Sequence, residues 1–120
     1  MSLTFKVVTT LVPVDLEIDG KIEPYELREM SAAARDSYLD VMSDRLRFDK
    51  DGNTAGVKKF EGMQADLLSR CLYRHNALAP VGKSVIQGWP SSVVAGLFAE
   101  AQKINLLGTG KEGTVEAKND

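Results

Sequence analysis

The sequence has little of the chemistry that metal sites and catalytic centres use. Its 120 residues include a single cysteine, Cys71, and a single histidine, His75. One cysteine cannot form an internal disulfide and is typical of a reducing cytoplasm. Zinc needs three or four ligands, and a catalytic Cys–His pair needs a third, orienting group that nothing in the sequence nominates. We therefore expect no catalytic residue, no metal and no cofactor, with Cys71 as a small core residue.

The sequence also lacks a charge excess and a long apolar run. It has 15 Lys and Arg residues against 17 Asp and Glu residues, which gives a net charge of −2. Proteins that bind nucleic acid through counterion release need a basic excess. No apolar stretch approaches the roughly 18 residues that span a membrane, and no signal-peptide pattern is present. We expect a cytoplasmic, single-domain protein that binds neither nucleic acid nor membrane.

Apolar residues that alternate with polar ones predict β-structure near the start of the chain. They are Leu3, Phe5 and Val7, and then Val12, Val14, Leu16 and Ile18. Period-two alternation is typical of strands with one buried face. Asp19-Gly20 predicts a tight turn, so the second stretch forms a β-hairpin, with an extra N-terminal strand over the first stretch as an alternative. Pro24 should end the return strand or lie at an edge, because it has no N–H.

Three helices are expected after the hairpin. Ser31 caps the first, which runs to about Phe48, and Thr54 caps the second. The third begins after Pro90, and Gly108 ends it. The apolar positions of the three helices are Tyr38, Leu39, Val41, Met42 and Leu46, then Val57, Phe60, Leu67, Leu68 and Cys71, then Val94, Leu97, Phe98, Ala101 and Ile104. The fold class is therefore α+β and mainly α, with one domain over residues 1–108 and a flexible tail over 109–120.

Two short motifs resemble ligand-binding loops without matching them. "APVGKS", residues 79–84, ends like a phosphate-binding loop, but the glycine required five positions before Gly82 is replaced by Ala77. "FDKDGN", residues 48–53, resembles a calcium loop, but Gly52 comes two positions too early when Asp49 is the first ligand. We interpret both as turns between elements, with Val85 and Ile86 packing into the core.

Two surfaces are candidates for binding a protein partner. Asp36, Asp40 and Asp44 recur at four-residue spacing and form an acidic stripe, which is either a solvated face or a docking surface for a basic partner. The third helix has more apolar residues than one buried stripe needs, so some belong either to the core or to an interface. The interface candidates there are Trp89, Val93, Leu97 and Leu107.

The segment "IDGKIEPYELREMSAAARDSYLDVM" combines a hairpin, a Met-Ser step and a helix, and in this it resembles the tail assembly chaperones of bacteriophages with long non-contractile tails. "LLSRCLYRHNALAPVGKSVIQGWPSSVVAGLFAEAQKINLL" is similar to their second half, in which a helix ends in a Cys-Leu step and a proline-started helix follows. The resemblance covers residues 12–108, and it departs at Arg74-His75-Asn76-Ala77, where an acid-x-x-glycine turn often stands.

The resemblance implies a non-enzymatic chaperone of the host cytoplasm that is absent from the mature virion. It also implies binding to the tape measure protein during tail assembly, with the tail tube protein as a further partner and homo-oligomerisation left open. The alternative is a structural tail or head–tail joining protein that is retained in the virion. An enzyme dependent on nucleotide or metal is a third hypothesis, which the incomplete motifs disfavour.

Overall fold

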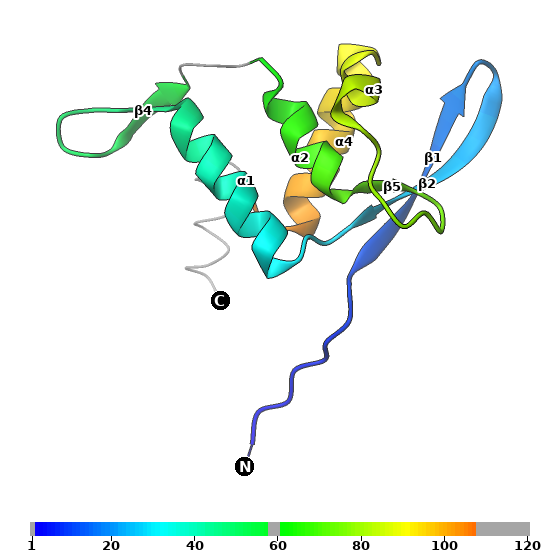
Figure 1. Ribbon diagram of the computed structural model, residues 1–120, viewed down its shortest axis with the longest axis horizontal. Coiled ribbons are helices and arrows are strands. Elements are labelled where there is room, and N and C mark those ends of the chain that lie inside the picture. Colours follow the sequence, from blue (N-terminus) through cyan, green and yellow to red (C-terminus); the bar gives the residue numbers. More distant parts are fainter. Residues whose placement is uncertain (1, 58–60, 108–120) are drawn as a thin grey trace.

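The computed structural model describes residues 2–57 and 61–107 of the chain, which form an α+β protein. The elements are β1 (Leu11–Ile18), β2 (Lys21–Arg28), α1 (Ala32–Arg45), β3 (Leu46–Phe48), β4 (Thr54–Val57), α2 (Met63–Cys71), β5 (Leu72–Arg74), α3 (Lys83–Gln87) and α4 (Ser91–Ile104). The helices lie between two hairpins, β1–β2 and β3–β4, which project on opposite sides (Figure 1). The predicted fold class is confirmed.

The hairpin at Asp19-Gly20 forms as predicted. Asp19 has φ 52° and Gly20 has φ 80°, and two successive positive φ angles are what a two-residue type I′ turn requires. Ile18 pairs with Lys21 across the turn, and β2 is the central strand of an antiparallel sheet with the order β1-β2-β5. The sequence pattern therefore set both the position of the turn and the register of β1 on β2.

Pro24 does not end the return strand, which corrects the prediction. It pairs with Asp15 inside β2, and that strand continues to Arg28. Pairs in an antiparallel ladder alternate between hydrogen-bonded and non-hydrogen-bonded, and the Ile18–Lys21 pair beside a two-residue turn is hydrogen-bonded. Counting from that pair places Pro24 at a non-hydrogen-bonded position of the β1 ladder, where its missing N–H removes no bond.

The extra N-terminal strand is not formed. Residues 2–10 have no regular structure, and the side chains of Leu3, Phe5 and Val7 are between 82% and 100% exposed. The segment is joined to the body at Thr10, whose carbonyl oxygen accepts a hydrogen bond of 2.8 Å from the Glu29 N–H. β2 ends one residue earlier, at Arg28, so among the described residues no neighbouring strand continues beside residues 2–9. An alternating sequence without a neighbouring strand cannot form a ladder.

The first helix begins as predicted and ends three residues early. The Ser31 hydroxyl accepts a hydrogen bond of 3.1 Å from the Ala34 N–H, which is the expected cap. After Arg45 the chain forms β3, which pairs with β4. The prediction that Thr54 caps a helix is therefore wrong, since Thr54 is the first residue of β4 and α2 begins only at Met63.

"FDKDGN" is a turn, but it joins two strands and not two helices. One carboxylate oxygen of Asp49 accepts hydrogen bonds of 2.9 Å from the backbone N–H groups of Asp51 and Asn53. Gly52 has φ 85°, which glycine adopts without strain. A local turn that closes a hairpin overrides the helical spacing of the apolar residues that follow. Phe60, which was expected on the second helix, lies outside the described residues, as do Gly108 and the predicted tail at 109–120.

The core lies where α2 and α4 pack beneath the sheet. Its fully buried members are Leu27, Leu67, Leu68, Cys71, Leu72, Ile86 and Ala101. The end of α4 is tied to the hairpin by Asn105, whose side-chain oxygen accepts a hydrogen bond of 2.8 Å from the Met30 N–H. Asn105 is buried and also donates to the Ala101 carbonyl. Both polar atoms of its side chain therefore have a hydrogen-bond partner, and these bonds fix one end of α4 against the segment between β2 and α1.

A buried carboxylate joins three helices. Asp66 of α2 is 8% exposed and accepts hydrogen bonds from Arg45 of α1 at 2.5 Å and from Lys83 of α3 at 2.8 Å. Burial by itself raises the pKa of the Asp66 carboxyl, but the hydrogen bonds and positive charges of Lys83 and Arg45 outweigh it. The pKa therefore lies below its ordinary value of 3.8. Arg45 also donates to the Glu61 carbonyl at 2.6 Å, which holds the start of α2.

Replacing Asp66 should destabilise the fold and reduce its sensitivity to acid. A carboxyl with a lowered pKa stabilises the folded state above its ordinary pKa, and that contribution is lost as the pH falls through the folded-state value. We expect Asp66→Asn to lower the free energy of unfolding by about 3 kcal/mol near neutral pH, because two cations lose their buried partner. Urea unfolding of this variant should depend less on pH below 3.8 than that of the unmodified protein.

Asp44→Asn is the matched control, since Asp44 is exposed on α1. It should change the free energy of unfolding by less than about 0.5 kcal/mol. Equal effects of the two substitutions would contradict a stabilising role for the buried cluster.

Candidate functional site

A cleft of about 560 Å³ lies between β1 and the start of α4. Leu16 and Ile18 line it from the hairpin, and Trp89, Pro90 and Val93 line it from the other side. The exposed acidic residues Asp15, Glu17 and Asp19 form its rim. Among the described residues that line this cleft, none is basic. It is therefore an apolar hollow with a negatively charged edge.

Trp89 is held in place by both the core and the local backbone. Its ring meets the Tyr25 ring edge to face, with the ring centroids 6.1 Å apart. Its backbone N–H donates to the Ile86 carbonyl at 3.0 Å, so the end of α3 fixes its position. Pro90 follows as the residue before α4 and sets the direction of that helix. One part of the indole is therefore buried against β2, and another part lines the cleft.

The structure brings together two of the four apolar residues that the sequence nominated. Trp89 is half-buried in the cleft wall, and Val93 beside it is 38% exposed. Leu97 is only 7% exposed and belongs to the core, which was one of the two possibilities that the sequence left open for it. Leu97 lies on the same side of α4 as Val94 and Ala101, and the core covers that side. Leu107 is half-buried and packs against the core.

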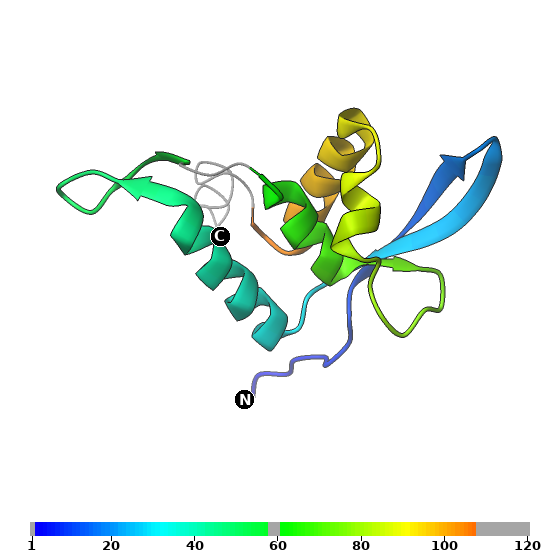
Figure 2. The same cartoon turned by 45° about the horizontal axis from the view of Figure 1, so that its top comes forward.

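The acidic stripe lies on a different part of the molecule. Asp36, Asp40 and Asp44 are all exposed on α1, as expected for a charged face. Figures 1 and 2 both show α2 and α4 between α1 and the β1–β2 hairpin. The stripe and the cleft are therefore separate surfaces, and a single small ligand cannot contact both.

The Gly-Lys-Ser segment opens α3, and its lysine is engaged by a carboxylate of the same chain. Gly82 precedes the helix, and the ammonium group of Lys83 is already bound to Asp66 at 2.8 Å. Ile86 is fully buried as predicted. Val85, which was expected to pack into the core, is 47% exposed, so that prediction is wrong. A five-residue helix has one buried face, and neighbouring residues cannot both lie on it.

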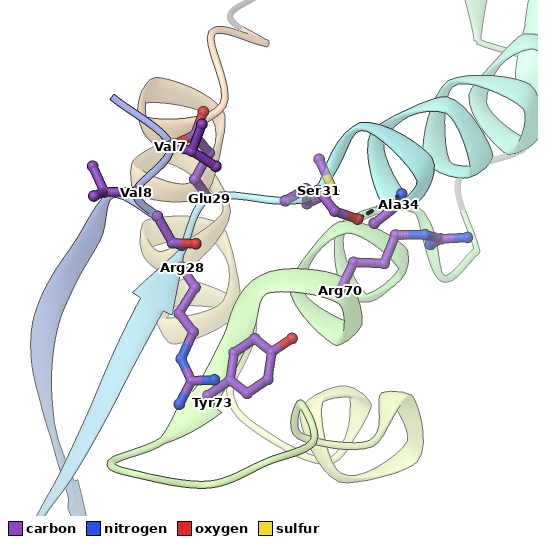
Figure 3. A pocket seen from close by; sticks show the side chains of 10 residues that line it. Val7, Val8, Arg28, Glu29, Ser31, Ala34, Arg70 and Tyr73 are labelled. Atoms are coloured by element: carbon purple, nitrogen blue, oxygen red, sulfur yellow. Dashed lines mark hydrogen bonds between the residues drawn. The ribbon is translucent and has the colours of Figure 1, made fainter. Parts of the chain in front are cut away.

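A second cavity, of about 460 Å³, lies between the N-terminal segment and the start of α1 (Figure 3). Val7 and Val8 line it on one side, and Arg28 and Tyr73 on the other. The Arg28 guanidinium lies 3.9 Å from the centre of the Tyr73 ring and also binds the Glu26 carboxylate at 2.6 Å. Because this cation is already engaged by the protein, we do not regard the cavity as an anion site.

Glu26 is a buried acid that sequence analysis did not single out. It is 5% exposed, and its carboxylate also lies 3.1 Å from Nδ1 of His75. The hydrogen bond from Arg28 lowers the pKa of Glu26, burial opposes this, and the contact with His75 lowers it further. These contacts join β2 to β5, so we assign Glu26 a structural role.

Within the described residues there is no cluster of three His, Cys, Asp or Glu side chains that could hold a metal ion. Burial raises the pKa of Cys71 to about 12, so its thiol stays protonated and unreactive.

No helix in the described ranges is long and apolar enough to cross a membrane. Comparison with protein-family models, curated proteins and solved structures found no match. The apolar cleft lined by Trp89 and Val93 is the candidate site on the strength of its own lining.

Two substitutions in α4 should separate the cleft from the core. Val93→Asp places a charge on a partly exposed side chain and should lower the free energy of unfolding by less than about 1 kcal/mol. Leu97→Asp buries the same charge without a partner and should cost about 4 kcal/mol or more. Thermal unfolding followed by circular dichroism measures both. A Val93→Asp variant that unfolds as readily as Leu97→Asp would show that Val93 is a core residue.

Proposed function

We propose that the protein is a non-enzymatic phage tail assembly chaperone that binds the tape measure protein through the cleft between β1 and α4. The observation that supports this most is the partly exposed pair of Trp89 and Val93 in an apolar hollow. Tryptophan dominates the energy of many protein interfaces, and apolar surface left open in a folded protein commonly marks a binding site. The resemblance of residues 12–108 to tail assembly chaperones names the partner.

The shape and charge of the cleft suit an amphipathic segment with basic flanks. Its volume lies within the range of about 300–1,000 Å³ that is usual for binding pockets. A helix presents apolar side chains three and four positions apart on one face, and such side chains can enter a hollow of this kind. Lysine or arginine residues beside them would meet the rim acids Asp15, Glu17 and Asp19. The tape measure protein is expected to be long and helical, so it offers many segments of this kind.

Capture of the tape measure protein from the same phage genome tests the proposal. We expect Val93→Asp to weaken binding by about tenfold or more, because it places a charge in the apolar part of the cleft. Co-expression followed by affinity purification, and then titration by biolayer interferometry, measures the loss.

Val85→Asp is the matched control. Val85 is 47% exposed on α3 and does not line the cleft. It should bind the tape measure protein like the unmodified protein. Equal binding by both variants and the unmodified protein would reject the cleft as the binding site, and a lack of capture by all three would reject the proposed partner.

Mass spectrometry of purified virions separates the chaperone from a structural tail protein. A chaperone that acts only during assembly should be absent from the particle, whereas a tail or joining protein should be present in stoichiometric amounts. Detection at the level of known tail proteins would overturn the proposal in favour of the structural role.

A further inference from the structure

Residues 3–8, which we call the N-terminal arm, are apolar, exposed and patterned as a strand. Leu3, Phe5, Val7 and Val8 are between 73% and 100% exposed. Leu3, Phe5 and Val7 would share one face of a strand, and Thr4 and Lys6 the other. Lys6 is the only charged residue of the arm. An apolar segment with this alternation is suited to pair with the free edge of a sheet.

The free edge of β1 borders the cleft. Within the part of the chain that the structure describes, β1 pairs only with β2, so its other side is open. Along β1, the backbone N–H and C=O groups of successive residues point alternately toward β2 and away from it. Because Ile18 and Lys21 form a hydrogen-bonded pair, the backbone groups of Asp15 and Glu17 point toward the open side. Pro13 points the same way but has no N–H, so it blunts the half of the edge that is farther from the turn. The half that remains usable is the half that lines the cleft.

The apolar and polar faces of the arm match the apolar and acidic faces of β1. Along β1 the half-buried Leu16 and Ile18 face the core side, whereas Asp15 and Glu17 are exposed on the opposite side. An antiparallel strand with Phe5 opposite Leu16 places Lys6 opposite Asp15. A shift of two residues places Phe5 opposite Ile18 and Lys6 opposite Glu17. In either register one pairing joins apolar side chains and the other joins opposite charges, and both kinds of pair stabilise sheets.

We infer that the N-terminal arm of a second copy of this chain adds to the free edge of β1 and inserts Phe5 into the cleft beside Trp89 and Val93. The arm of the same copy is poorly placed to do so. It leaves β1 at the end opposite the turn (Figures 1 and 2), and its residues Val7 and Val8 lie on the side of the start of α1 and not beside the cleft. The bond between Thr10 and Glu29 holds the chain in that direction.

The inference rests on the proposed function only in its use of the same cleft. An arm that occupies the cleft must be displaced before another protein segment can bind there. Self-association and capture of the tape measure protein should therefore compete. A protein lacking residues 2–9 should be monomeric and should still capture the partner, at least as tightly as the full chain.

Sedimentation velocity over a concentration series tests the arm. The full chain should associate reversibly, and Phe5→Asp should raise its dissociation constant by about tenfold or more. Leu78→Asp is the matched control, because Leu78 is fully exposed in the loop after β5 and lies outside the cleft. It should associate like the unmodified protein. A full chain that stays monomeric at its highest attainable concentration would overturn the inference.

Charge exchange and a peptide identify the surface. Lys6→Glu should weaken association, and Asp15→Lys together with Glu17→Lys should restore it in the Lys6→Glu background.

A synthetic peptide of residues 2–9 should bind the protein that lacks them, and Val93→Asp should abolish that binding. Failure of the charge exchange to restore association would overturn the proposed edge. Peptide binding by an arm-less protein whose full-length form is monomeric would mean that the arm docks within its own chain, which also rejects a second copy.

A negative outcome here would leave the chaperone proposal intact. Capture of the tape measure protein is measured on the arm-less variant, in which self-association cannot interfere. A monomeric full chain that captures its partner through Val93 would reject only the arm, whereas an associating chain that captures nothing would reject only the partner.

Discussion

The buried carboxylate of Asp66 is the interaction on which the rest of the structure depends. It binds a cation from α1 and a cation from α3, while its own backbone belongs to α2. A buried carboxylate without partners would lower the stability of the fold by several kcal/mol. The hydrogen bonds of Asp66 are therefore made only when all three helices are in place. This cluster holds α3 against α2, and the end of α3 in turn positions Trp89 through the Ile86 carbonyl. The position of Trp89 in the cleft wall therefore depends on the ion cluster of Asp66, although Asp66 does not line the cleft.

The two sides of the cleft come from parts of the chain that are far apart in sequence. β1 contributes one side, and the step from α3 to α4 contributes the other. They are joined because the Tyr25 ring, on the neighbouring strand, packs against the Trp89 ring. Asn105 fixes the far end of α4 to the segment after β2. Tyr25 thus holds Trp89 at the start of α4, and Asn105 holds the end of that helix. A hollow with walls held in this way can bind a partner without a large ordering cost.

The open edge of β1 and the apolar cleft together make the β1 side of the molecule suited to contacts with other chains. Edge strands associate unless a charge, a proline or a covering segment prevents it. Here Pro13 protects one half of the edge, and Asp15 and Glu17 restrict the other half to strands that bring a positive charge. Such selectivity would suit the proposed chaperone, because a cleft filled by the proposed arm would be kept from indiscriminate apolar contacts.

The sequence by itself determined the features that depend on a few adjacent residues. Asp19-Gly20 specified a type I′ turn, the Ser31 hydroxyl began α1, and Pro90 placed the start of α4. Only the tertiary structure decided the rest. Within the part of the chain that the structure describes, it left the alternating residues 2–9 without a partner strand, and it assigned Lys83 to a buried acid on another helix. Turns and caps follow from local backbone preferences, whereas the cleft depends on which distant elements pack together, and no short stretch of sequence contains that information.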